Sequence, residues 1–163
     1  MAGDYSVFRT TMNIPYPYPD GAAEKWIARH TLDYLERRHM TLAVRKHDGT
    51  LLGAVGLALC VEHRHAELGY WIGREYWNNG YCTEAAREML AFGFGELELN
   101  RIFARHLGIN PASGKVMHKI GMKREALLRQ HYLKEGKLAD VLCYAILRDE
   151  FAGLDQVRSM RLA

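Results

Sequence analysis

The feature of this chain that most constrains its fold is a helical pattern set between two strand patterns. Residues 66–73 read as a strand, residues 80–94 as an amphipathic helix and residues 101–107 as a second strand. Neighbouring strands that are connected by a helix lie parallel, because the helix carries the chain back across the sheet. Ligands of such sheets commonly bind at the carboxyl end of the strand that leads into the crossover helix. In this chain that end is the segment 73–80.

The segments on either side of this unit predict a mostly antiparallel sheet. Residues 40–45 and 51–61 have strand patterns and are joined by a turn over residues 47–50, so with residues 66–73 they predict three successive antiparallel strands. Near the C-terminus, residues 123–132 and 138–147 predict a further hairpin.

Two further helices are predicted. Three prolines within residues 14–21 exclude a regular helix there, and Asp20 is expected to cap a helix over residues 22–38. Residues 113–120 predict another helix, which Gly121 ends. The whole order predicts a single α+β domain over residues 1–163, with a mixed sheet, mostly antiparallel with one parallel pair, flanked by helices.

Composition and charge narrow the functional classes. The 22 basic and 19 acidic residues give a net charge of +3 and are scattered, which argues against nucleic-acid binding. The longest apolar stretch, residues 51–61, is too short to span a membrane. The three cysteines form no CxxC pair, and His63 and His65 lack a third ligand, so we expect no disulfide and no metal site. Reduced thiols favour a cytoplasmic protein.

The start of the crossover helix is a candidate anion site. Gly80 lies there after two asparagines, and the first turn of a helix has unpaired N–H groups and partial positive charge, which suit a phosphate. No Gly-Lys-Ser/Thr follows, and only one glycine of a GxGxxG motif is in place, so ATP hydrolysis and dinucleotide reduction are poor interpretations. Taken alone, one glycine at a helix start more often marks an ordinary turn.

Three blocks of sequence together resemble a known family. Residues 66–85, AELGYWIGREYWNNGYCTEA, resemble the acetyl-CoA-binding segment of the GNAT superfamily, and in particular of its RimJ and RimL branch of ribosomal-protein N-terminal acetyltransferases. NPAS at residues 110–113 and IGMKRE at residues 120–125 resemble the next helix and strand of that branch. DVLCYAIL at residues 140–147 resembles its last strand.

The resemblance implies an enzyme that transfers the acetyl group of acetyl-CoA to a primary amine by direct attack, with a protein N-terminal α-amine as the first candidate acceptor. It implies a GNAT fold in which residues 66–72 and 101–107 splay apart around the pantetheine arm. A small-molecule or antibiotic amine as acceptor, and a non-catalytic acyl-CoA-binding domain, are the alternatives. The residues implied in acetyl-CoA binding are Tyr70, Trp71, Ile72, Trp77, Asn78, Asn79, Gly80, Tyr81, Cys82, Thr83, Asn110 and Ser113.

The chain departs from the family pattern at both ends of the phosphate loop and near the N-terminus. Trp77 and Cys82 fill the outer positions of the superfamily pattern Gln/Arg-x-x-Gly-x-Gly/Ala, but backbone amides do the binding, so the site is retained. Cys82 is either a reactive thiol at a helix N-terminus or a small packed residue. Family members usually begin with a strand, which we expect to be missing before Ile14, and its loss would leave one sheet edge unpaired.

Ser113 and Glu67 are the candidate catalytic residues. Many superfamily members protonate the leaving thiolate with a tyrosine at the position of Met117, so Ser113 is the expected acid here. Glu67, on the central strand, is the expected base, and His65 and Glu62 are alternatives that act through water. The simpler interpretations are a helix serine bonded to local backbone and a glutamate on a half-exposed sheet face.

The acceptor site is expected at the proline-rich loop. Tyr16 and Tyr18 are expected to line it, with Tyr132 and Asp140 helping to hold a cationic amine. An aromatic, acidic slot suits a peptide α-amine, an aminoglycoside or a polyamine about equally. Asn110 is expected either to bind the pantetheine arm or to cap its helix. The oligomeric state stays open, a homodimer included.

Overall fold

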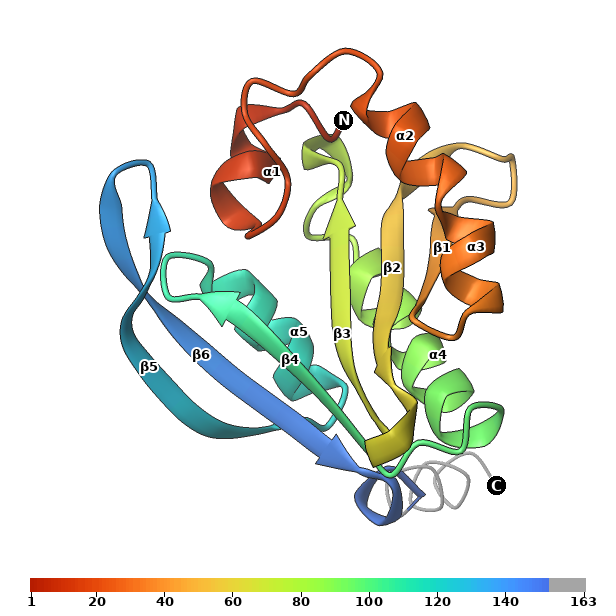
Figure 1. Ribbon diagram of the computed structural model, residues 1–163. Helices are drawn as coiled ribbons and strands as arrows, with labels where there is room; N and C mark the ends of the chain where they lie inside the picture. The colour runs from red at the N-terminus through yellow and green to blue at the C-terminus, as the bar shows by residue number, and fades with distance from the viewer. Residues whose placement is uncertain (153–163) are drawn as a thin grey trace.

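The computed structural model describes residues 1–152 and shows a six-stranded sheet with helices packed against it (Figure 1). The strands lie in the order β1-β2-β3-β4-β6-β5, which confirms the predicted mixed α/β sheet. No helix in this part of the chain is long and apolar enough to cross a membrane. The elements are α1 (Tyr5–Thr10), α2 (Ala22–Ala28), α3 (His30–Leu35), β1 (His39–Arg45), β2 (Leu51–Cys60), η1 (Val61–His63), β3 (His65–Ile72), η2 (Arg74–Tyr76), α4 (Tyr81–Gly95), β4 (Arg101–Leu107), α5 (Pro111–Lys119), β5 (Lys123–Lys134) and β6 (Lys137–Leu147).

Strands β1, β2 and β3 form the antiparallel series that the sequence predicts. The turn between β1 and β2 contains Gly49 at a φ of 90°, a conformation that glycine adopts without strain. The N–H of Thr50 donates to Asp48 Oδ1 (2.9 Å) and holds this turn. The predicted hairpin of β5 and β6 is also present, and its turn contains Glu135 and Gly136, both at positive φ.

Helix α4 carries the chain back across the sheet, so β3 and β4 are parallel, as predicted. Their pairing covers only residues 65–67 of β3 and 101–103 of β4, and Glu67 with Phe103 is the last pair. Beyond this point β3 stays in register with β2, and β4 stays in register with β6. The two strands therefore diverge, which is the splay that the resemblance implies (Figure 1).

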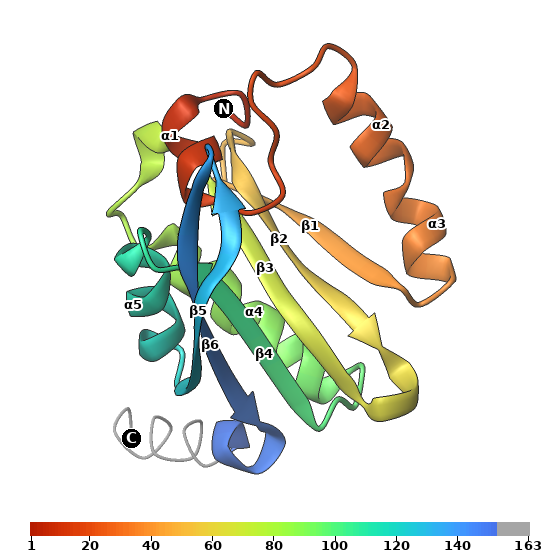
Figure 2. The same cartoon turned by 60° about the vertical axis from the view of Figure 1, so that its left-hand side comes forward.

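Helices α4 and α5 lie on one face of the sheet and bury the core against it, whereas α2 and α3 lie beside β1 (Figure 2). Side chains that alternate along β2 and β3, such as Leu57 and Leu68, point to this core. Helix α4 adds Met89 and Leu90, and Ile102 of β4 is fully buried among them. This packing fixes α4 and α5 relative to the two diverging strands.

The residues before β1 differ from the prediction. Helix α1 forms in a segment for which no element was predicted, and Asp4 caps it by accepting a hydrogen bond from the Ser6 N–H (2.6 Å). The single helix predicted over residues 22–38 is two short helices that meet at Arg29. Gly21, at a φ of 72°, is the N-cap of α2, and no side chain caps that helix, so the prediction for Asp20 is wrong.

The exposure of α2 and α3 explains why they are short. Neither helix buries a residue, and Ile27 and Leu35 are 58% and 71% exposed. Most helix stability in proteins comes from packing an apolar face, and here that face has little to pack against. Beside them, β1 is the edge of the sheet: among residues 1–152 no strand precedes it, and none pairs with its outer side.

Gly53 and Gly69 allow a matched test of the packing between β2 and β3. A Cβ atom on Gly53 would lie 2.1 Å from the carbonyl oxygen of Trp71, whereas one on Gly69 would meet nothing within 4 Å. We expect Gly53→Ala to lower the free energy of unfolding by about 1–3 kcal/mol, because backbone must move. Gly69→Ala should leave it unchanged or raise it slightly. Urea denaturation measures both, and equal effects would contradict this close approach.

Candidate functional site

The loop between β3 and α4 is held in shape by its own side chains. Trp77 Nε1 donates to the carbonyl oxygen of Ile72 (2.7 Å), and the guanidinium of Arg74 lies 4.8 Å from the centroid of the Trp77 ring system. Asn79 Nδ2 donates to the carbonyl oxygens of Tyr76 (3.2 Å) and Trp77 (2.9 Å). Trp77 and Asn79, both predicted at the cofactor site, thus use their side chains to hold the loop.

The first turn of α4 has unused hydrogen-bond donors. Asn78 and Gly80 have φ values of 64° and 85°, and no side chain caps the helix. Within residues 1–152 the N–H groups of Tyr81 and Cys82 have no acceptor, whereas the N–H of Thr83 bonds back to the Gly80 carbonyl (2.9 Å). Unpaired N–H groups at the positive end of a helix fit a phosphate, as the sequence predicts for Gly80.

Cys82 lies in this turn, and its surroundings disfavour a nucleophilic role. Burial raises the pKa of its thiol to about 12. The thiol therefore stays protonated at neutral pH, and the thiolate is the reactive form. Of the two interpretations of Cys82, the geometry favours the small packed residue.

Tyr70 and Ser113 meet on the helix side of the splay. Tyr70 extends from β3 to α5, where its hydroxyl donates to the carbonyl oxygen of Ser113 (3.1 Å) and lies 2.9 Å from Ser113 Oγ. Burial raises the pKa of Tyr70, so its hydroxyl keeps its proton. Ser113 is 9% exposed. A pair of protonated hydroxyls therefore bridges β3 to the helix that follows β4.

Asn110 both caps α5 and holds α1. Its Oδ1 accepts from the N–H of Ser113 (3.2 Å), and its Nδ2 donates to the carbonyl oxygen of Thr10 (2.9 Å). The capping role predicted for Asn110 is thus present in the structure. Further along α5, Met117 is 1% exposed and belongs to the core cluster. Ser113 is therefore the residue of α5 that places a hydroxyl group near the splay.

A cavity of about 230 Å³ opens on the other face of the sheet. Glu67 and Gly69 line it because they alternate along β3 with Leu68, which points into the core. Other residues come from β1, β4, β5 and the segment after α1. The polar residues that line the cavity are Asn13, His39, Glu67, Arg105, His131 and Tyr132.

Glu67, the predicted base, is paired with Arg105 in this cavity. Arg105 Nε donates to Glu67 Oε1 (2.8 Å), and Arg105 Nη2 donates to Oε2 (2.9 Å). The ion pair connects β3 and β4 close to the point where their backbone pairing ends. The alternative bases are elsewhere: His65 is the first residue of β3 and Glu62 lies in η1 before it, away from the strand end that leads to α4.

The residues predicted for the acceptor site are only partly brought together. Tyr132 lines the cavity, but Tyr16 and Tyr18 do not. Tyr16 instead stacks on Phe8 of α1, with ring centroids 5.2 Å apart. Asp140 directs its carboxylate to a backbone N–H of β5 (2.8 Å) rather than into the cavity.

Helix α1, which the sequence analysis missed, is tied to the β5–β6 hairpin beside the cavity. The ammonium of Lys134 donates to the carbonyl oxygen of Thr11 (2.9 Å) and lies 3.6 Å from the centroid of the Phe8 ring. The Tyr132 hydroxyl donates to the carbonyl oxygen of Met12. Lys134 is 7% exposed, and burial lowers its pKa. The local signal for this helix was Asp4 as a capping residue before an apolar stretch.

His39, Arg105 and His131 were also missed as site residues. They come from β1, β4 and β5, which are far apart in the sequence. Alternation along the strand predicted over residues 101–107 does place Arg105 on the same face as Phe103, the partner of Glu67. No local sequence pattern shows whether His39 and His131 face the cavity or the protein surface.

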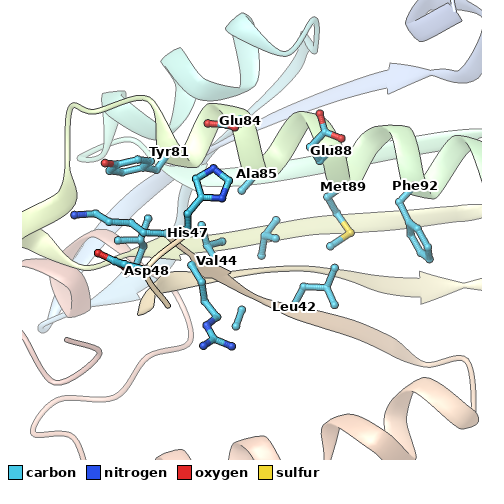
Figure 3. A pocket seen from close by; sticks show the side chains of 15 residues that line it. Leu42, Val44, His47, Asp48, Tyr81, Glu84, Ala85, Glu88, Met89 and Phe92 are labelled. Atoms are coloured by element: carbon cyan, nitrogen blue, oxygen red, sulfur yellow. The ribbon is translucent and has the colours of Figure 1, made fainter. Parts of the chain in front are cut away.

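A larger groove, of about 830 Å³, lies between α4 and the strands β1 and β2 (Figure 3). Its floor is apolar and includes Leu42 and Met89, and its rim carries Glu88 on α4 and His47 on the β1–β2 turn. Of the residues implied in cofactor binding, Tyr81 is the one that lines it. The groove is therefore separate from the cavity that contains Glu67.

Comparison with known proteins matches this arrangement to one family. Residues 1–123 match the family described as "Acetyltransferase (GNAT) domain". The chain is 35% identical over 117 residues to "Uncharacterized N-acetyltransferase YoaA" of Bacillus subtilis (strain 168), covering 71% of this chain and 66% of that protein. It is 35% identical over 108 residues to "Putative ribosomal N-acetyltransferase YdaF" of the same organism, covering 66% and 59%. The matches thus span two thirds or less of these relatives.

A solved structure shares the fold. Spermidine N-acetyltransferase from Vibrio cholerae, in complex with CoA and spermine, superposes with a TM-score of 0.75 at 21% identity. The match covers 85% of this chain and 81% of that one. Identity at this level shows a common fold and leaves the acceptor open.

The raised pKa of Cys82 makes its reactivity testable. With a thiol pKa of about 12, little thiolate is present at pH 8. We therefore expect iodoacetamide to modify Cys82 at least about a hundredfold more slowly than a free cysteine, whose pKa is about 8.5, and faster as the pH rises. Mass spectrometry of digested samples over time gives the rate, with Cys60 as an internal comparison. Modification of Cys82 at the rate of free cysteine would contradict the packed-residue interpretation.

Proposed function

Because the chain belongs to the GNAT acetyltransferase family, we propose that it transfers the acetyl group of acetyl-CoA to a primary amine, with a protein N-terminal α-amine as the acceptor. The observation that carries this proposal is the uncapped start of α4, led by Gly80 at positive φ, at the end of a strand that splays from its neighbour. Phosphate-binding groups and an open strand edge are thus adjacent.

In this proposal the cofactor lies along the helix side of the splay. The free N–H groups of Tyr81 and Cys82 bind the pyrophosphate, as helix N-termini bind anions. The gap between β3 and β4 takes the pantetheine arm. The stretch from Tyr70 to Ile72, which is not paired with β4, offers backbone N–H groups to the thioester carbonyl.

The transfer forms a C–N bond to the acetyl carbon and breaks the C–S bond of the thioester. An amine that arrives as an ammonium ion must first lose a proton, and Glu67 is the proposed acceptor of that proton. Arg105 occupies both carboxylate oxygens, so Glu67 acts through a bridging water or after the pair opens. The nitrogen loses a second proton as the amide forms, and one proton in total leaves to solvent.

Ser113 is the proposed acid for the leaving thiolate. Its hydroxyl lies 2.9 Å from the hydroxyl of Tyr70, which keeps its proton because burial raises its pKa. Ser113 can therefore donate its proton to the sulfur, and the second proton that the nitrogen releases restores the serine hydroxyl. This pair supplies the function that a tyrosine at the position of Met117 has in many superfamily members.

The activity itself is tested with purified protein, acetyl-CoA and a panel of amines. We expect release of free thiol that depends on the added amine, measured with a chromogenic thiol reagent. CoA binding without turnover on any amine would instead indicate a non-catalytic acyl-CoA-binding domain. Failure to bind CoA at all would contradict both interpretations.

Replacement of Ser113 separates its chemical role from a structural one. We expect Ser113→Ala to lower kcat about a hundredfold, because the thiolate loses its proton donor. The dissociation constant for CoA should change less than about twofold, since Tyr70 keeps its bond to the backbone carbonyl of residue 113. Steady-state kinetics and calorimetry measure the two quantities. Equal losses in turnover and affinity would refute the assignment of Ser113 as the acid.

Gly80 and Gly21 form a matched pair for testing the phosphate site. Both are N-cap residues in the left-handed conformation, at φ values of 85° and 72°. Alanine at either position costs about 1–2 kcal/mol of backbone strain. We expect Gly80→Ala to weaken CoA binding about tenfold, because the N–H groups of the first turn move. Gly21→Ala should leave CoA affinity unchanged, and a similar loss in both variants would contradict the proposed site.

A further inference from the structure

We propose that Arg105 determines which amines this enzyme accepts. By pairing with Glu67, Arg105 neutralises the charge of the carboxylate in the acceptor cavity. The site therefore accepts molecules in which the amine to be acetylated is the only cationic group that enters the cavity. Polyamines, which bring a second ammonium group, are disfavoured. This inference rests on the proposed function and names the substrate class of that same site.

The geometry of the pair leaves Glu67 little capacity for another cation. Both carboxylate oxygens accept hydrogen bonds from the guanidinium, at 2.8 and 2.9 Å. The two side chains are 36% and 29% exposed, so the pair is partly screened from water. A bidentate arginine–carboxylate pair is among the stronger charge-assisted contacts, and the planar guanidinium is always charged. A second ammonium group would have to displace it or lie beside its positive charge.

The remaining residues of the cavity offer no replacement for that carboxylate. Among the described residues that line it, Glu67 is the single acid. Burial lowers the pKa of His39 below its usual value, which favours the uncharged ring at neutral pH. The other basic side chains that line the cavity are His131 and Arg105. The cavity therefore has no excess of negative charge with which to attract a dication.

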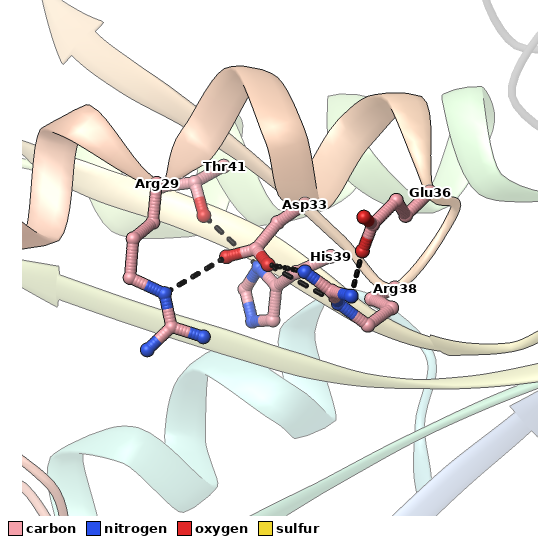
Figure 4. Close-up of polar contacts among 6 residues, drawn as sticks. All are labelled: Arg29, Asp33, Glu36, Arg38, His39 and Thr41. Atoms are coloured by element: carbon pink, nitrogen blue, oxygen red, sulfur yellow. Dashed lines mark hydrogen bonds and ion pairs between the residues drawn. The ribbon is translucent and has the colours of Figure 1, made fainter.

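The acids next to the cavity are occupied as well. Asp33 lies beside His39 and accepts hydrogen bonds from Arg38 (2.8 Å at the closest), with Arg29 at 3.8 Å (Figure 4). Arg38 also pairs with Glu36. On the opposite side, the carboxylate of Asp140 accepts the backbone N–H of Gln130 (2.8 Å). Arginine or backbone thus engages each of these three acids, which leaves them less free to bind a polycation.

The test compares two acceptors in wild type and variants. Spermidine represents a polyamine, and a tripeptide with uncharged side chains represents a peptide α-amine. We expect wild type to use the tripeptide with a kcat/KM at least about tenfold higher than spermidine. Arg105→Gln frees the carboxylate of Glu67, so the ratio of spermidine to tripeptide kcat/KM should rise at least about tenfold, and less at high salt.

Two further variants separate charge from structural damage. Arg101→Gln removes the other arginine of β4 that pairs with a glutamate, Glu125, outside the cavity, and should leave the ratio unchanged. The double variant Glu67→Gln/Arg105→Gln removes both charges, and with them the proposed base, so it is compared by binding: it should bind spermidine no more tightly than wild type. Calorimetry with CoA confirms that each variant is folded and retains its cofactor site. Direct titration with spermidine should show tighter binding to Arg105→Gln than to wild type.

The outcomes distinguish this inference from the proposed function. Equal use of spermidine and tripeptide by wild type overturns the inference and leaves the acetyltransferase proposal standing, and this result needs no variant. An unchanged ratio in a folded Arg105→Gln variant also overturns it. CoA binding without turnover on these two amines overturns the inference, and the same result on every amine of the panel overturns the proposed function with it.

Discussion

The early end of the β3–β4 pairing is the constraint on which the rest of the site depends. Strand β2 holds β3 in antiparallel register, and β6 does the same for β4, so each strand keeps its own direction beyond Glu67 and Phe103. The two halves of the sheet must then separate. The separation leaves one edge of β3 without a partner strand in the middle of the domain, where a ligand can reach its backbone.

One polar contact crosses the gap on each face of the sheet. Tyr70 and Ser113 meet on the side of α4 and α5, and Glu67 and Arg105 meet on the other side. The two contacts define different environments, one part-buried and made of hydroxyls, the other more exposed and ionic. Such a division suits a reaction in which a thioester and an amine approach from opposite faces. Helix α1, anchored through Lys134, lies beside the β5–β6 hairpin, and the segment that follows it lines the ionic cavity.

Much of the fold could be predicted because it depends on local pattern. The strand over residues 101–107 was predicted with its observed bounds, and the crossover helix and Gly80 were predicted within one residue of α4. Prediction failed where tertiary packing decides the outcome. The apolar face of residues 22–38 found no core, so the helix divided at Arg29, and α1 forms where its side chains meet the β5–β6 hairpin.

The sequence by itself determined the order of the strands, the parallel crossover and the glycine-led start of α4, because periodicity and turn chemistry are local properties. It also predicted Ser113 and Glu67 as candidate catalytic residues. Only the tertiary structure decided their partners. Tyr70 reaches Ser113, 43 positions away, on one face of the sheet, and Arg105 reaches Glu67, 38 positions away, on the other. Register between distant strands sets such pairings, and no local pattern encodes it.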